Sequence, residues 1–226
     1  GLHRLSASTL ATMPSAQLAP LAEANIYDMV SDQHGGLWIC TSKGLGHYDN
    51  ATGALRLYTT RNSQLPDNEV FCMGLARDGR GWVSTAGGQC MWNPDQRMVT
   101  TSGMISRVVK LGMLQNIKLL ADGRMLFVPQ NGNPAVLNPE NGELRTLAFK
   151  ALGSGRVFLD IEPFGPKRYI VTCSDAVYLV GATGQVRRFG HIDGLSNSQF
   201  QSHAICVDPS TSTYWAATNG GLVYAR

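Results

Sequence analysis

Short apolar runs separated by glycine-rich polar turns recur along the whole chain at a nearly constant spacing. The runs are aligned by one position, occupied by Trp38, by Trp82 44 residues later, and by Leu126 a further 44 residues on. Ile170 follows after another 44 residues and Trp215 after 45. Five copies at so constant a spacing predict a repeat protein, in which each copy is one supersecondary unit.

Each copy has the pattern of four short strands. The first is an apolar run that leads to a turn of Asp, Gly, Pro or Ser, and the second carries the Trp or its substitute. A glycine-rich turn leads to the third strand, and a Thr-Gly or Asn-Gly pair supplies the positive φ for a tight hairpin into the fourth. The five expected first strands are Ile26–Val30, Val70–Ala76, Gln115–Leu120, Val157–Glu162 and His203–Val207.

Four strands in each unit of about 44 residues are typical of the blade of a β-propeller. We therefore predict an all-β protein, a β-propeller of about five four-stranded blades, with no helix longer than about two turns. It is expected to be a single domain over residues 1–226, with blades at approximately 25–64, 65–110, 111–152, 153–195 and 196–226, and with 1–24 completing the last blade.

Both ends of the chain correspond to the third strand of a repeat copy. Gly1–Leu5 resembles the third-strand segment Gly44–Tyr48, and the chain ends on a third strand at Gly221–Arg226. The segment Ser6–Leu21 is therefore expected to supply the missing fourth strand of the last blade and to close the ring, which would remove exposed sheet edges. A fragment of a longer array of blades would also have third strands at its two ends, so a closed ring and a fragment both remain open.

The tryptophans are interpreted as packing residues. An indole is large and flat enough to fill the wedge between neighbouring blades. We expect Trp38, Trp82 and Trp215 to occupy equivalent, mostly buried places, and Trp92 to lie on a third strand outside that set.

The repeat resembles the two-component regulator propeller family. Asp32, Gly35-Gly36-Leu37-Trp38-Ile39-Cys40-Thr41, Gly44-Leu45 and Tyr48-Asp49 together are a near-complete match to its consensus. Leu65–Val70 and Asp193–Phe200 resemble its inter-blade loop. The match covers the whole chain and is strong in blades one, two and five, whereas blades three and four carry Leu126 and Ile170 in place of the Trp.

The resemblance implies the periplasmic, or more generally extracytoplasmic, sensor region of a hybrid two-component histidine kinase. Such a region would respond to an oligosaccharide or another small solute, and its protein partners would be neighbouring sensor domains or a second copy of itself. Two alternatives remain open: a structural or protein-interaction propeller without a small ligand, and a propeller lyase or hydrolase.

Composition and charge narrow the possible partners. The formal net charge is only +3, charged residues make up 15%, and Lys and Arg form no run. A nucleic-acid or membrane surface normally has a clustered basic face, so neither partner is expected. No apolar stretch approaches the roughly 18 residues that a membrane-spanning helix needs, and residues 1–24 lack the pattern of a signal peptide.

Neither a metal nor a cofactor is expected. The five cysteines form no Cys-x-x-Cys pair and the five histidines have no metal-ligand spacing. The cysteines lie in apolar strand-like runs, which favours unbridged, buried thiols, with Cys40 and Cys173 on second strands and Cys72 and Cys206 on first strands. Asp32, Asp78 and Asp122 each precede a turn glycine, so a role in capping the turn is favoured over calcium binding.

No catalytic motif occurs in the sequence, which is why we do not expect an enzyme. A ligand would be bound by the loops on one propeller face, which join the second strand to the third and each fourth strand to the next blade. Amides, a guanidinium and a carboxylate in such loops could pair with sugar hydroxyls. The candidate ligand-binding residues are Asn68, Gln89, Gln130, Asn131, Arg156, Asp175, Ser198 and Asn219.

Overall fold

The computed structural model describes residues 2, 4–5, 8, 12–13, 16–32, 34–93, 97–99, 103–153, 156–165, 168–181, 183–190, 193, 200–208, 211, 213–218 and 221–225. The chain divides into two compact units, residues 1–113 (unit 1) and 114–226 (unit 2). Both consist mainly of antiparallel sheets in which successive strands of the chain are hydrogen-bonded neighbours.

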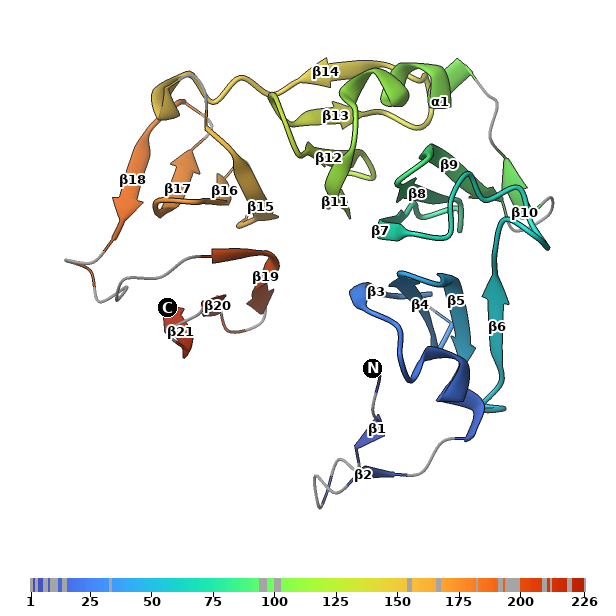
Figure 1. The fold of residues 1–226 in the computed structure, drawn as a ribbon. Coiled ribbons are helices and arrows are strands. Elements are labelled where there is room, and N and C mark those ends of the chain that lie inside the picture. Colours follow the sequence, from blue (N-terminus) through green and yellow to red (C-terminus); the bar gives the residue numbers. More distant parts are fainter. Residues whose placement is uncertain are drawn as a thin grey trace. The chain divides into compact units, whose positions relative to one another are not determined.

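Unit 1 contains a two-stranded hairpin and two four-stranded sheets (Figure 1). Its elements are β1 (Arg4–Leu5), β2 (Thr12–Met13), the 3-10 helix η1 (Ala16–Leu21), β3 (Ile26–Ser31), β4 (Gly36–Thr41), β5 (Gly44–Asp49), β6 (Leu55–Tyr58), β7 (Val70–Leu75), β8 (Gly81–Thr85), β9 (Gly88–Asn93), β10 (Arg97–Val99), the helix α1 (Gly103–Val108) and the 3-10 helix η2 (Val109–Leu111).

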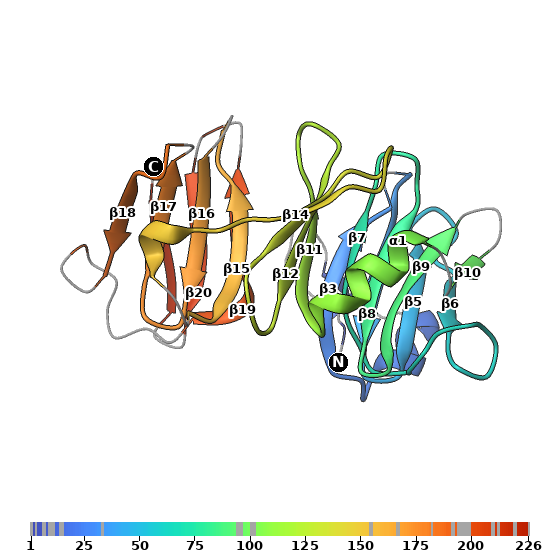
Figure 2. The same cartoon turned by 90° about the horizontal axis from the view of Figure 1, so that it is seen from above.

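Unit 2 contains two four-stranded sheets and one three-stranded sheet, each a meander of neighbouring strands (Figure 2). Its elements are β11 (Leu114–Leu119), β12 (Met125–Pro129), β13 (Ala135–Leu137), β14 (Leu144–Thr146), the 3-10 helix η3 (Lys150–Leu152), β15 (Phe158–Pro163), β16 (Arg168–Cys173), β17 (Val177–Gly181), β18 (Val186–Phe189), β19 (Phe200–Asp208), β20 (Thr213–Thr218) and β21 (Gly221–Ala225).

The strand register confirms the repeat, including the two copies that lack a Trp. Trp38 and Trp82 lie opposite Val30 and Gly74 of the first strand of their own sheet. Leu126, Ile170 and Trp215 hold the same position in their sheets, because they lie opposite Lys118, Glu162 and Cys206. In every one of these sheets the register between the first and second strand shifts near the start of the first strand.

The predicted turns form for the reasons that the sequence suggests. Gly53, Gly142 and Gly184 have φ of 72°, 70° and 83° in the hairpins between the third and fourth strands. The Asp32 carboxylate accepts hydrogen bonds from the backbone N–H groups of His34 and Gly36, and Asp78 and Asp122 accept the same kind of bond two residues ahead. The repeated aspartates therefore cap the turns, as predicted.

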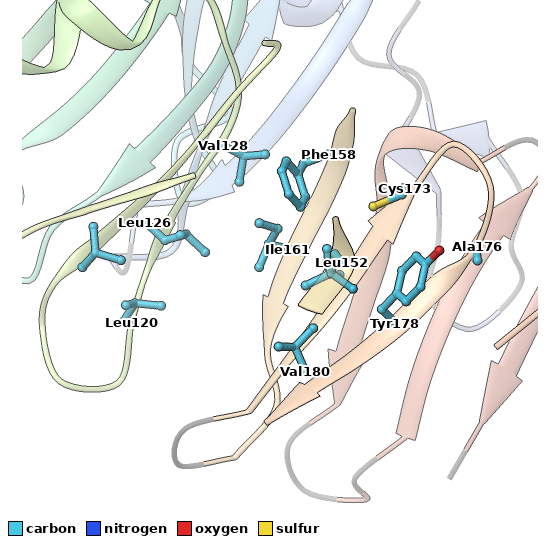
Figure 3. Packing of buried hydrophobic residues seen from close by; sticks show 12 residues of the cluster. Leu120, Leu126, Val128, Leu152, Phe158, Ile161, Cys173, Ala176, Tyr178 and Val180 are labelled. Atoms are coloured by element: carbon cyan, nitrogen blue, oxygen red, sulfur yellow. The ribbon is translucent and has the colours of Figure 1, made fainter. Parts of the chain in front are cut away.

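Buried side chains pack between neighbouring sheets within each unit. In unit 1, Trp38 lies 4.9 Å from Trp92 of the following sheet, measured between ring centroids. Figure 3 shows the corresponding cluster in unit 2, in which Leu126 and Val128 of β12 pack with Phe158 and Ile161 of β15. In the described part of the chain the longest helices have six residues.

Two predictions about the end of the chain need correction. Trp215 was expected to be mostly buried, but 38% of its surface is exposed, whereas Trp38 and Trp82 are 4% and 2% exposed. Trp215 belongs to the last sheet of unit 2, where no following sheet of that unit covers it, and it stacks instead on Tyr224 at 5.1 Å. For the same reason Cys206, which lies opposite Trp215, is exposed.

The role of Ser6–Leu21 as the fourth strand of the last sheet remains a prediction. The described residues of this segment include β2, which pairs with β1, and η1. A hairpin with a neighbour in sequence has the smaller loop-closure cost, which favours this local pairing. Closure of five blades into a ring remains a prediction.

Cys40 and Cys173 lie on second strands, and Cys72 and Cys206 on first strands, as predicted. None of the five cysteines, all of which the structure describes, is in a disulfide, and all except Cys206 are buried. Burial raises the pKa of the buried thiols, in Cys90 and Cys173 to about 12.

Candidate functional site

Unit 2 has a hollow of about 530 Å³ between two connections of the chain. The first connection joins β12 to β13, and the second runs from β14 through η3 to β15. Hydrogen bonds from Leu147 N–H to Pro134 O (2.7 Å) and from Leu152 N–H to Phe149 O (2.8 Å) hold these connections in place. The volume lies in the range typical of small-molecule sites, about 300–1,000 Å³.

The hollow combines exposed polar groups with an aromatic wall. Three of its lining residues, Gln130, Asn131 and Arg156, were predicted from the sequence as ligand-binding residues. Phe149, from the second connection, also lines the hollow, and its ring centroid lies 5.9 Å from that of Phe158. The full lining is Gln130, Asn131, Gly132, Asn133, Ala148, Phe149, Lys150, Gly153, Arg156, Val157 and Phe158.

Arg156 is held in place on three sides. Its Nη1 donates to Asp175 Oδ1 at 2.7 Å, its Nε donates to the carbonyl of Leu152, and its guanidinium lies 5.0 Å from the centroid of the Tyr178 ring. The phenol of Tyr178 in turn donates to Asp175 Oδ2 at 2.7 Å. A guanidinium fixed in this way loses little conformational entropy when it hydrogen-bonds a ligand.

Asp175, from the turn between β16 and β17, does not line the hollow but contacts Arg156. Partial burial tends to raise the pKa of its carboxyl, but the hydrogen bonds from Arg156 and Tyr178 outweigh burial and lower the pKa. The hydrogen bond to Asp175 is also the main reason that the pKa of Arg156 is raised. Both groups are therefore charged at neutral pH.

The remaining predicted site residues lie elsewhere or outside the described residues. Asn68 and Gln89 belong to unit 1, where the Asn68 side chain accepts from Thr60 N–H at 2.9 Å. Gln89 is buried and donates to the carbonyl of Gly112. Both amides are therefore used inside the protein. Ser198 and Asn219 lie outside the described residues.

Sequence reasoning missed Asn133, Phe149 and Lys150. Asn133 could have been found from its place in the loop that contains Gln130 and Asn131. Phe149 and Lys150 have no motif, and only the path of the chain from β14 to β15 brings them to the hollow.

The titratable side chains of the lining are the basic residues Lys150 and Arg156. The lining residues that the structure describes include no His, Cys, Asp or Glu. Among the described residues no three His, Cys, Asp or Glu side chains gather as a metal site would require. No described helix is long and apolar enough to cross a membrane.

The sheets and their register define a propeller-like all-β protein, and comparison with known proteins agrees. No family model matches the chain, and no curated protein matches it. Among solved structures, it is similar to the extracellular domain of the hybrid two-component system BT3049 from B. thetaiotaomicron, with a TM-score of 0.78 and 17% identity over 95% of this chain and 29% of the other.

Two further structures extend this comparison. The extracellular domain of BT4673 from the same organism, described as a one-component system, has a TM-score of 0.67 at 17% identity, over 89% of this chain and 27% of that domain. Virginiamycin B lyase from Staphylococcus aureus has a TM-score of 0.59 at 15% identity, over 89% and 69% of the two chains.

The chain thus spans less than a third of the length of the two extracellular domains. At these identities the similarity establishes the fold. It confirms, at the level of the fold, the resemblance to regulator propellers that the sequence suggested.

Proposed function

We propose that this chain is an extracytoplasmic recognition region of a two-component sensor and that the hollow in unit 2 binds a glycan fragment or a related polyol. The observation that carries the proposal is the convergence of Gln130, Asn131 and a fixed Arg156 around an aromatic wall. Amides and a guanidinium suit sugar hydroxyls, and an apolar ring suits the C–H face of a sugar. The sequence resemblance and the shared fold of sensor extracellular domains supply the signalling context.

Isothermal titration calorimetry of the purified chain against a panel of neutral and acidic oligosaccharides tests this proposal. At least one oligosaccharide should bind, and Arg156→Gln should weaken its affinity at least tenfold, because the variant loses the fixed charged donor. Arg145→Gln is the matched control: Arg145 is exposed on β14, pairs with Glu143 and does not line the hollow. Failure of the whole panel to bind, or equal losses in the two variants, would contradict the proposal.

Two other functions follow from specific observations. The fold shared with virginiamycin B lyase favours a lyase as an alternative, and Lys150 is the lining residue that could act as its acid or base. Incubation with a virginiamycin B-type substrate, followed by mass spectrometry, would reveal turnover. The exposed pair Trp215 and Tyr224 instead suits a protein-interaction propeller, which would self-associate in analytical ultracentrifugation and bind no oligosaccharide.

A further inference from the structure

Unit 2 contains a buried charged cluster that the proposed ligand site does not use. Lys118 of β11 contacts two carboxylates of the neighbouring sheet: its Nζ lies 2.8 Å from Asp160 Oδ1 and also pairs with Glu162. Asn116 donates to the same Asp160 oxygen at 2.7 Å, as does the backbone N–H of Ile161 at 2.8 Å. One oxygen of the fully buried Asp160 thus accepts three hydrogen bonds.

The other oxygen of Asp160 has no hydrogen-bond partner among the described residues. The same is true of two further buried oxygens, Thr172 Oγ1 and the hydroxyl of Tyr214. Asp160 and Thr172 are directly opposite each other on β15 and β16 and are completely buried, and Tyr214, from β20, is 7% exposed. Buried polar atoms are rarely left unpaired, because such an atom gives up its hydrogen bonds to water without gaining others in return.

Asp160 and Thr172 both influence the phenol of Tyr214. The pKa of the Tyr214 phenol is raised, mainly by burial and further by the negative charges of Asp160 and Glu162, while the hydroxyl of Thr172 acts in the opposite direction. Tyr214 therefore keeps its proton at neutral pH and can donate it. The Thr172 hydroxyl is near enough to the phenol to lower its pKa, but the pair does not have the geometry of a hydrogen bond, and both oxygens remain without a partner among the described residues.

Asp28 of unit 1 is the equivalent of Asp160, and both oxygens of its carboxylate accept hydrogen bonds. Asp28 lies opposite Cys40 in its sheet, as Asp160 lies opposite Thr172. Its Oδ1 likewise accepts a hydrogen bond from the N–H of the next residue, Met29, at 2.8 Å. Its Oδ2 accepts the backbone N–H of Met73 in the following sheet, at 3.3 Å. In unit 2 the residue equivalent to Met73 is Ile205, which follows the irregular part of β19.

We propose that a single internal water molecule bridges Asp160 Oδ2, Thr172 Oγ1 and the Tyr214 hydroxyl and so links the sheet β15–β18 to the sheet β19–β21. A buried water typically makes about three hydrogen bonds to otherwise unsatisfied groups, and this site offers three. The water accepts from Tyr214 and donates to Asp160 and Thr172. A monovalent cation fits less well, because the Lys118 ammonium already neutralises part of the charge.

A high-resolution crystal structure of the whole chain, grown from potassium salts and again from sodium salts, tests the site directly. The expected result is one isolated peak at about 2.8 Å from each of the three oxygens, the usual O–H···O separation, in both salts. Direct hydrogen bonds among the three oxygens without an intervening peak would overturn the proposal. Shorter, salt-dependent distances would overturn it in favour of a cation.

Matched variants supply a second measurement in solution. Thr172→Val removes the hydroxyl at nearly constant shape and should lower the midpoint of urea unfolding, whereas Thr172→Ser keeps the hydroxyl and should stay closer to the wild type. Tyr214→Phe should also lower the midpoint, and Tyr224→Phe, on a side chain that is 63% exposed, should not. Equal midpoints for Thr172→Val and Thr172→Ser, or for the two tyrosine variants, would contradict the bridge. If Thr172→Val does not fold, the wild-type crystal structure decides.

Discussion

The interface between the two four-stranded sheets of unit 1 contains an aromatic cluster, whereas the interface between the two four-stranded sheets of unit 2 combines an apolar cluster with buried ion pairs. In unit 1, Trp38 packs with Tyr58 and with Trp92 of the next sheet. In unit 2, side chains exactly one repeat apart meet across the sheets, Asn116 with Asp160 and Lys118 with Glu162. The repeat geometry thus determines which positions meet, and the residue types determine the kind of contact.

The register explains why the two chemistries occur where they do. On the second strand of unit 1 each Trp lies opposite a smaller residue, Trp38 opposite Val30 and Trp82 opposite Gly74. In unit 2 the smaller Leu126 and Ile170 lie opposite the long side chains of Lys118 and Glu162. Opposite residues share one face of the sheet. Where Leu or Ile replaces the Trp, the larger side chain opposite it therefore fills part of the volume that the indole would occupy.

The largest effect that we expect comes from Trp82→Ala in unit 1. Trp82 is 2% exposed, so its removal leaves a cavity and should lower the free energy of unfolding by about 3–5 kcal/mol. Urea unfolding followed by circular dichroism measures this loss. Trp215→Ala is the control at the equivalent position: because Trp215 is 38% exposed, its loss should be clearly smaller. Equal losses would mean that exposure does not distinguish the two sites.

The next effect concerns the buried ion pairs of unit 2. Lys118→Met keeps the length of the side chain but leaves Asp160 and Glu162 without their cation, which should cost about 3 kcal/mol, the lower end for a broken buried ion pair. The lower end applies because 16% of the Lys118 side chain is exposed. The control is Lys150→Met, which makes the same exchange at an exposed residue. A Lys118→Met variant as stable as this control would show that the cluster contributes nothing to stability.

Sequence reasoning was most successful where a feature repeats. The first strands, the positive-φ glycines and the aspartate-capped turns were predicted because each occurs in several copies. The exposure of Trp215 was missed because it depends on what covers the last sheet. The Lys118 cluster was missed as well, since its residues lie in runs that read as ordinary strands and meet only once the 44-residue register is known.

The candidate site was predicted in part. Gln130, Asn131 and Arg156 were selected because loops on one propeller face carry polar residues, and the structure brings these three to one hollow. Asn68 and Gln89 fitted the same description, yet their amides hydrogen-bond neighbouring backbone groups. Composition alone does not separate a polar group that supports a loop from one that faces a ligand.

The smallest effect is expected at Asp175, whose ion pair with Arg156 is partly exposed and therefore resembles a surface pair rather than the Lys118 cluster. The Asp175 side chain is 43% exposed, so Asp175→Asn should cost only about 0.2–1 kcal/mol near neutral pH.

Because the pKa of Asp175 is lowered in the folded state, its contribution to stability is present above the pKa of an unfolded aspartate, 3.8, and is lost as the pH falls through the lowered value. Urea unfolding at neutral pH and at a series of values below pH 3.8 should therefore separate wild type and variant at neutral pH, and the difference should shrink steadily as the pH falls. Glu140→Gln, at an exposed residue of the turn before β14, is the control and should show no such convergence. A difference that persists unchanged at low pH would mean that Asp175 acts through its shape rather than through its charge, and the fixed orientation of Arg156 would then need another cause.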